Sequence, residues 1–223
     1  MKQAATASLL AFTAGFVDTA GFIALFGLFT AHVTGNFVLI GASLADFHPG
    51  ILGKLLALPV FILAVAFARI YVLGREKRGH DGAGGLLVAE LVFLSAFLAA
   101  GVAAAPFTDA DAPLTILTGQ LAVVAMAVQN AASRTVFAKL SPTTVMTGNV
   151  TQIVIDAVDL LGGASAGAEI KARLKKMAPP VVTFALGAMA GALGYVALGF
   201  WCIAAPITSV VLIFFLRRGA ASA

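Results

Sequence analysis

One acidic side chain, Asp18, stands in the middle of an apolar run near the start of the chain. An ionisable group inside a membrane segment costs several kcal/mol, so such residues are functional candidates by default. Desolvation disfavours the charged form of a carboxyl group, so Asp18 could bind and release a proton during a transport cycle. The alternative is structural, with Asp18 capping a turn or hydrogen-bonding to a neighbouring helix.

A tripeptide occurs twice, as Thr34-Gly35-Asn36 and as Thr147-Gly148-Asn149, 113 residues apart (147 − 34). Each copy follows a short irregular stretch and opens a run that is helical in pattern, 37–45 and 150–161. Helix starts carry unpaired N–H donors and a positive dipole end, and hydrocarbon tolerates neither without a polar partner. Thr can cap, Gly permits close approach, and Asn both donates and accepts. We expect both copies to bind a solute; mutual capping is the alternative.

Two amides, Gln129 and Asn130, occupy in the second half the place that Asp18 holds in the first. An amide does not titrate, so any proton coupling would be asymmetric between the halves. The alternative is interhelical hydrogen bonding, worth about 1 kcal/mol in membranes. Near these positions, Arg134 is expected to reach the membrane surface, and His32 is expected to make a structural hydrogen bond.

The composition is that of a polytopic membrane protein. The chain of 223 residues is 61% apolar and 11% charged, with a mean hydropathy of +1.03, whereas soluble domains are about a quarter charged. The single cysteine, Cys202, has no partner thiol, and the three histidines are scattered. We therefore predict no metal or cofactor site. The usual catalytic motifs are missing from the sequence, which predicts that the protein is not an enzyme.

The apolar segments predict an all-α transmembrane bundle that forms one integral membrane domain, 1–223. Two repeats, 6–105 and 114–216, would each contain three spans and one short broken or re-entrant helix. The six spans are 6–28, 51–74, 85–105, 114–138, 178–197 and 200–216. Three crossings per half make the repeats inverted, a common transporter plan. Eight full spans are the alternative.

Charge decides between the two topologies. With six spans, the basic groups Lys2, Arg75–Arg78, Lys171–Lys176 and Arg217-Arg218 all fall on one side, as the positive-inside rule requires for the cytoplasm. The other side receives Asp109, Asp111 and Lys54. Eight spans would divide the basic loops between the two sides. The net charge of +4 therefore indicates insertion topology and not nucleic-acid binding.

Two further patterns have plain interpretations. Glu90 lies only a few residues inside its segment and is expected to reach the headgroup region. The glycines of Gly187–Gly191 form a small-xxx-small face, for which tight internal packing is favoured over dimerisation.

Four motifs in order carry a resemblance to a known family: Gly15–Asp18, Thr30–Asn36, Ala127–Ala131 and Val145–Asn149. The chain resembles the YoaK/DUF1275 family of bacterial inner-membrane proteins over nearly its whole length. The resemblance implies a multi-pass protein of the bacterial cytoplasmic (inner) membrane, with a single integral membrane domain. It implies no substrate.

The leading expectation is a secondary transporter or channel for a small, anionic solute, coupled to protons through Asp18. The alternative is a non-transporting membrane protein that binds or assembles with another complex. The expected partners are the lipid bilayer and a small molecule or ion, with a homodimer as an option, both termini in the cytoplasm and no nucleic acid.

Overall fold

The structure is a computed structural model that describes residues 2–45, 49–163 and 166–221, with side chains described between Gln3 and Arg217. The side chains of Lys2 and Arg218, and residues 46–48 beyond the helical run predicted over 37–45, lie outside the described residues. The described chain is all-helical, as predicted. Its elements are α1 (Lys2–Ala24), α2 (Gly35–Ser43), α3 (Ile51–Glu76), α4 (Ala83–Ala104), α5 (Pro113–Arg134), α6 (Thr147–Leu161), α7 (Gly167–Leu198), the 3₁₀ turn η1 (Gly199–Ile203) and α8 (Ala204–Ala221).

Five helical segments of the described chain are long and apolar enough to cross a bilayer. They are α1, α3, α4, α5 and the segment Gly167–Arg217, in which α7, η1 and α8 follow one another. The nine residues of α2 and the fifteen of α6 reach about 14 and 23 Å, less than the bilayer core of about 30 Å. The length of the two short helices therefore favours the six-span topology over the eight-span alternative.

The first apolar segment ends at Ala24, four residues before the predicted end. Phe26 and Gly27 adopt left-handed φ values of 53° and 78°, and the Gly27 N–H donates to the Phe22 carbonyl at 2.9 Å. This closure resembles a Schellman cap. The buried Lys54 ammonium then donates to the Phe26 carbonyl at 2.8 Å, so the reversed turn keeps its carbonyl paired.

The structure corrects the prediction that the cluster Lys171–Lys176 lies in a loop. Helix α7 begins at Gly167, so the cluster Lys171–Lys176 lies on its first turns and not in a loop. Ala, Leu, Lys and Arg in this stretch are good helix formers. In addition, Arg173 donates to the buried carboxylate of Asp156 on α6 at 2.7 and 2.5 Å. These bonds hold the pKa of Asp156 below its ordinary value and join the two helices.

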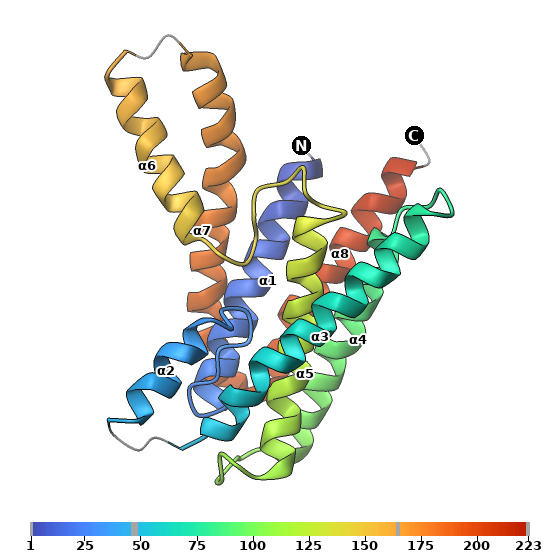
Figure 1. The fold of residues 1–223 in the computed structure, drawn as a ribbon, viewed down its shortest axis with the longest axis vertical. Coiled ribbons are helices and arrows are strands. Elements are labelled where there is room, and N and C mark those ends of the chain that lie inside the picture. Colours follow the sequence, from blue (N-terminus) through green and yellow to red (C-terminus); the bar gives the residue numbers. More distant parts are fainter. Residues whose placement is uncertain (1, 46–48, 164–165, 222–223) are drawn as a thin grey trace.

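The helices pack as a bundle with two divergent arms (Figure 1). Helix α1 packs against α7, α8 and α5; α5 also packs against α4 and α3, and α4 against α8. The short helices rest on single neighbours, α2 on α3 and α6 on α7. In Figure 1, α2 and α6 run toward opposite ends of the molecule, and both termini lie at the same end.

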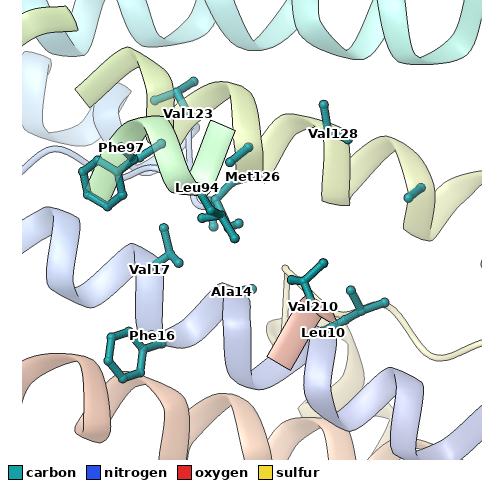
Figure 2. Packing of buried hydrophobic residues seen from close by; sticks show 14 of the residues in the cluster. Leu10, Ala14, Phe16, Val17, Leu94, Phe97, Val123, Met126, Val128 and Val210 are labelled. Carbon is teal, nitrogen blue, oxygen red and sulfur yellow. The ribbon is translucent and has the colours of Figure 1, made fainter. Parts of the chain in front are cut away.

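Apolar side chains fill the space around α1. Leu10, Ala14 and Val17 are fully buried, and Figure 2 shows them facing side chains that include Met126 of α5 and Val210 of α8. Leu94 of α4 belongs to the same cluster. Helix α1 is therefore the central element of the bundle, and 67% of the residues in its most apolar stretch are buried.

Glycines bring α1 and α7 into backbone contact. A Cβ added to Gly187 would lie 2.2 Å from the Phe12 carbonyl oxygen, and one added to Gly191 would lie 2.4 Å from that of Phe16. On the other helix, a Cβ on Gly15 would lie 2.2 Å from the Phe184 carbonyl oxygen. The interpretation of this face as internal packing is confirmed.

We expect Gly187→Val and Gly191→Val each to lower the free energy of unfolding by about 2–3 kcal/mol, because the new side chain meets a backbone oxygen that cannot yield. Thermal unfolding in detergent micelles measures the effect. Gly84→Ala in α4 is the matched control, since nothing lies within 4 Å of its added Cβ. Equal stability of the Val variants and the control would contradict the close α1–α7 contact.

Candidate functional site

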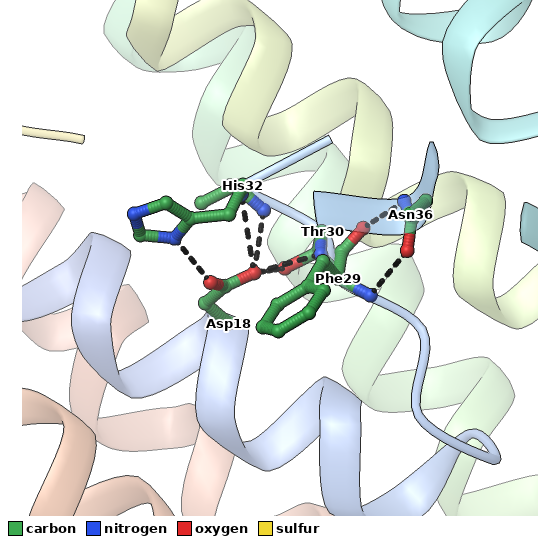
Figure 3. A network of polar contacts seen from close by, with 6 residues as sticks. Asp18, Phe29, Thr30, His32 and Asn36 are labelled. Atoms are coloured by element: carbon green, nitrogen blue, oxygen red, sulfur yellow. Dashed lines mark hydrogen bonds and ion pairs between the residues drawn. The ribbon is translucent and has the colours of Figure 1, made fainter. Parts of the chain in front are cut away.

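The carboxylate of Asp18 holds the break that follows α1 (Figure 3). Its Oδ1 atom accepts the backbone N–H groups of Thr30 and Ala31, each at 2.7 Å, and the Thr30 hydroxyl at 3.3 Å. Asp18 is 5% exposed. A buried carboxylate that accepts several N–H bonds is strongly stabilised, so Asp18 replaces the helical partners that the broken backbone has lost.

The second oxygen of Asp18 contacts a histidine. Oδ2 lies 2.6 Å from Nδ1 of His32, as Figure 3 shows. His32 lies in the connection between α1 and α2, outside the apolar helical segments. Its hydrogen bond to Asp18 raises the pKa of the imidazole above its ordinary value, against the opposing effect of burial. The imidazole side chain is 33% exposed, so the pair combines a buried anion with a cation that can meet a ligand.

The asparagine of the first tripeptide is a backbone clamp. Asn36 accepts the Phe29 N–H at 3.0 Å and donates to the Phe29 carbonyl at 2.9 Å. It is 1% exposed and reaches back seven residues along the chain. The amide group therefore satisfies both backbone polar groups of Phe29 in the irregular stretch.

The second tripeptide repeats the clamp. Asn149 is buried and donates to the Pro142 carbonyl at 2.9 Å, again seven residues back. Proline has no N–H group, so the reciprocal bond of the first clamp has no counterpart here. The amide nitrogen also lies 3.6 Å from the Met146 sulfur.

Gln129 is the residue that takes the place of Asp18 at the second break. Its fully buried amide donates to the Leu10 carbonyl of α1 at 2.8 Å and to the Thr143 hydroxyl at 3.3 Å. Its Oε1 atom is buried and without a hydrogen bond in the described part of the chain. Asn130 is half-buried, and within the described residues no hydrogen bond joins its side chain to the break. The structure therefore separates the two amides that the sequence analysis grouped.

A cavity of about 440 Å³ opens beside the Asp18–His32 pair. The residues that line it come from α1, the connection, α2 and α7: Asp18, Thr19, Phe29, His32, Thr34, Gly35 and Phe184. The His32 ring meets the Phe184 ring edge-on, with centroids 5.6 Å apart. The first tripeptide and Asp18 are thus brought together around one cavity.

The starts of α2 and α6 differ in the free backbone N–H groups that were expected at both. At the start of α2, the N–H groups of Gly35, Asn36 and Phe37 already donate to carbonyls three residues back, at 2.7–3.2 Å. At the start of α6, Thr147 and Gly148 are exposed, and the first helical bond runs from the Val150 N–H to Met146. The second tripeptide is not among the residues that line the cavity, so the two helix starts do not share it.

Comparison with known proteins places the chain in a family. The family described as "Protein of unknown function (DUF1275)" matches residues 6–216. The chain belongs to the DUF1275 family. It is 32% identical over 150 residues to the UPF0700 transmembrane protein YoaK of Bacillus subtilis (strain 168); this match covers 67% of the chain and 64% of the relative's length. No solved structure matches the chain. Membership and the apolar helices identify a multi-pass membrane protein.

Sequence reasoning did not predict the burial of two ionisable side chains of this DUF1275 protein, Glu90 and Lys54. Glu90 was expected to reach the headgroups, but it is 1% exposed, and its Oε1 atom lacks a hydrogen bond in the described residues. Lys54 was counted as a charge on the side opposite the basic groups, but it is 4% exposed and donates to the carbonyls of Phe26 after α1 and of Pro49 before α3. The signal available for Glu90 was its place on the helical face of Leu87 and Leu94, at intervals of three and four residues.

The clamp suggests a paired measurement. We expect Asn36→Ala to lower the free energy of unfolding by about 1–3 kcal/mol, because the backbone N–H and the backbone C=O of Phe29 both lose their partner. Asn149→Ala should cost less, since only the Pro142 carbonyl is left. Asn130→Ala is the control, and chemical or thermal unfolding in micelles ranks the three. A ranking that places Asn130→Ala first would contradict the clamp.

Glu90 gives a second test. An unpaired charge in the core is costly, so the group is best accommodated as the neutral acid. We therefore expect Glu90→Gln to change the free energy of unfolding by less than about 1 kcal/mol, whereas Glu90→Ala should be clearly more destabilising because it leaves a cavity. Equal losses in the two variants at neutral pH would show that a charged carboxylate is required there.

Proposed function

We propose that this DUF1275 protein is a secondary transporter or channel for a small anionic solute, and that the Asp18–His32 pair makes the movement proton-dependent. The observation that carries the proposal is the imidazole of His32, bonded to a buried carboxylate and partly exposed in a cavity of about 440 Å³. The proposal includes an inverted repeat, a six-span topology and a cytoplasmic location for both termini.

The packing of the helices supports an inverted repeat. Suppose that α1 corresponds to α5, α2 to α6, α3 to α7 and α4 to α8. The main helix–helix contacts of one half then have an equivalent in the other half. The α1–α7 contact becomes α5–α3, α1–α8 becomes α5–α4, and α2–α3 becomes α6–α7, all of which are present. The opposite directions of α2 and α6 in Figure 1 agree with an axis in the membrane plane. Such repeats are frequent among transporters.

Local hydrogen bonds support the same correspondence. Each tripeptide asparagine donates at 2.9 Å to the carbonyl seven residues before it. Each preceding helix closes with an N–H bond to the carbonyl five residues back, from Gly27 to Phe22 and from Phe137 to Ala132. These two local features, together with the matching helix contacts, are better explained by duplication than by chance.

Both breaks are tied to α1. The first is bonded directly to Asp18. The second is bonded through Thr143 to Gln129 of α5, which also donates to the Leu10 carbonyl of α1, eight residues (18 − 10) or about 12 Å along the helix from Asp18. Broken helices near the middle of the bilayer are the sites at which transporters bind solutes. A solute in the cavity would contact both halves of the chain, because Phe184 of α7 lines it.

Charge favours an anion over a cation. The Oδ1 atom of Asp18 is occupied by N–H donors and Oδ2 by His32, which leaves little capacity to coordinate a cation. When His32 is protonated, the pair is neutral, and the positive end of α2 attracts an anion. When His32 loses its proton, the charge of Asp18 is uncompensated and repels one. Anion binding is therefore linked to proton binding.

Topology follows from the basic residues. The six crossings are α1, α3, α4, α5, α7 and α8. The basic turn after α3 lies at the end of the molecule where both termini are found (Figure 1), and Lys139 lines a cavity there together with Gln3 and Ala4. The loop that contains Asp109 and Asp111 lies at the opposite end. Positive charge marks the cytoplasmic side, so the termini are cytoplasmic and the membrane is the bacterial inner membrane.

We expect solute flux in proteoliposomes to be highest below the pKa of His32, which lies above its ordinary value of 6.5, and to fall as the pH rises through that pKa. His32→Gln should remove this dependence, because the amide keeps a hydrogen bond to Asp18 without titrating. Flux of radiolabelled small anions between pH 5 and 9 measures it. Thr147→Ser, outside the cavity, is the control.

An unchanged pH profile in His32→Gln would remove the proton coupling but leave transport standing. A wild-type chain that moves no anion at any pH would instead favour the second candidate, a non-transporting binding or assembly protein. One observation favours that candidate: the exposed apolar stripe Val150, Val154, Val158 and Leu161 on α6. Recovery of one stoichiometric membrane partner through this stripe would support it.

A further inference from the structure

A second cavity lies near the end of the molecule where both termini are found. It has a volume of about 380 Å³, between the start of α1, the connection that precedes α6, and the first turns of α7. Its lining consists of Gln3, Ala4, Ala7, Lys139, Leu140, Ser141, Ala172, Lys175 and Lys176. This cavity shares no residue with the cavity beside Asp18.

The charges that line this cavity are all positive. Lys139 comes from the connection and Lys175 and Lys176 come from α7, and none of the three forms an ion pair within the described chain. Ala172, Lys175 and Lys176 are spaced at three and four residues, so they share one face of α7. The nearby guanidinium of Arg173 is already bonded to Asp156. Three exposed lysines without a counter-charge in the described chain therefore line one cavity.

A buried hydroxyl completes the lining. Ser141 is 3% exposed, and its Oγ atom has no hydrogen-bond partner in the described residues. A buried polar atom without a partner costs about 1–3 kcal/mol, and a ligand oxygen in the cavity would remove that cost. The hydroxyl can donate, and so can every ammonium group. Four side chains of the lining, three lysines and one serine, can therefore donate to a ligand.

We propose that this cavity binds a phosphate group, with Lys139, Lys175, Lys176 and the Ser141 hydroxyl as its ligands. A phosphate supplies several strong acceptor oxygens and a negative charge, which match this set of donors. The volume lies in the range of small-molecule sites, about 300–1,000 Å³, and so accommodates a phosphate with a substituent. Two sources share this chemistry: a soluble phosphate compound and the headgroup of an anionic phospholipid.

Such a ligand would join two elements at the second break. Lys139 and Ser141 lie in the connection, whose Thr143 accepts a hydrogen bond from Gln129, and Lys175 and Lys176 belong to α7. A bound phosphate would therefore hold the connection and α7 together around the start of α6. This role does not depend on whether the protein transports a solute.

The full chain in detergent micelles tests the soluble source by calorimetric titration with inorganic pyrophosphate. Nanodiscs of phosphatidylcholine, with and without phosphatidylglycerol, test the lipid source by the shift in thermal unfolding. The triple variant Lys139→Gln/Lys175→Gln/Lys176→Gln should weaken the response about tenfold or more, and Ser141→Ala should weaken it by a smaller factor. The control triple Lys77→Gln/Arg78→Gln/Lys171→Gln removes as many positive charges outside the cavity and should stay within about twofold.

A response to pyrophosphate alone assigns the soluble source, and a response to phosphatidylglycerol alone assigns the lipid. Equal losses in the two triple variants would overturn the proposal, because net surface charge would then explain the binding. No response to either probe by the wild-type chain would also overturn it. If the first triple variant does not fold, Lys139→Gln alone and Ser141→Ala decide by the same comparison.

Discussion

The structure depends on one requirement: a helix that stops inside hydrocarbon must have its free backbone groups paired within the protein. Asp18 meets it for the first break by accepting the N–H groups of Thr30 and Ala31. Asn36 pairs the backbone N–H and C=O of Phe29, and Lys54 pairs the Phe26 carbonyl. With these groups satisfied, the chain can turn back against the bundle and begin α2.

The contact between α1 and α7 places this polar turn. Because the glycines let the two backbones touch, Phe184 of α7 reaches the His32 ring and closes one wall of the cavity. A larger residue at Gly15, one turn before Asp18, would push α7 away and open that wall. Small residues in the packing interface and polar residues at the break are therefore parts of one arrangement, and neither forms the cavity without the other.

Much of this could be predicted from the sequence, but only where the signal is local. Composition and repeated apolar runs indicate a membrane bundle, and the tripeptides mark both breaks to within a few residues. The partners of the breaks could not be predicted, because they depend on which helices meet. The sequence places Glu90 near the end of a helix, where an exposed side chain is expected, yet the neighbouring helices bury it. Likewise, α7 continues through the Lys171–Lys176 cluster because α6 packs along it.

The difference between the two breaks bears on function. Both need a side chain that reaches from the long helix to the irregular stretch, and the second break is served by Gln129, a neutral amide bonded to Thr143. That amide pairs no backbone N–H group of the irregular stretch, and its own oxygen has no hydrogen bond in the described residues. At the first break a carboxylate accepts backbone N–H groups and is paired with a partly exposed histidine. Because burial makes a charge more costly than an amide, the first break carries a cost that the second avoids, and the proton dependence proposed above would give that cost a function.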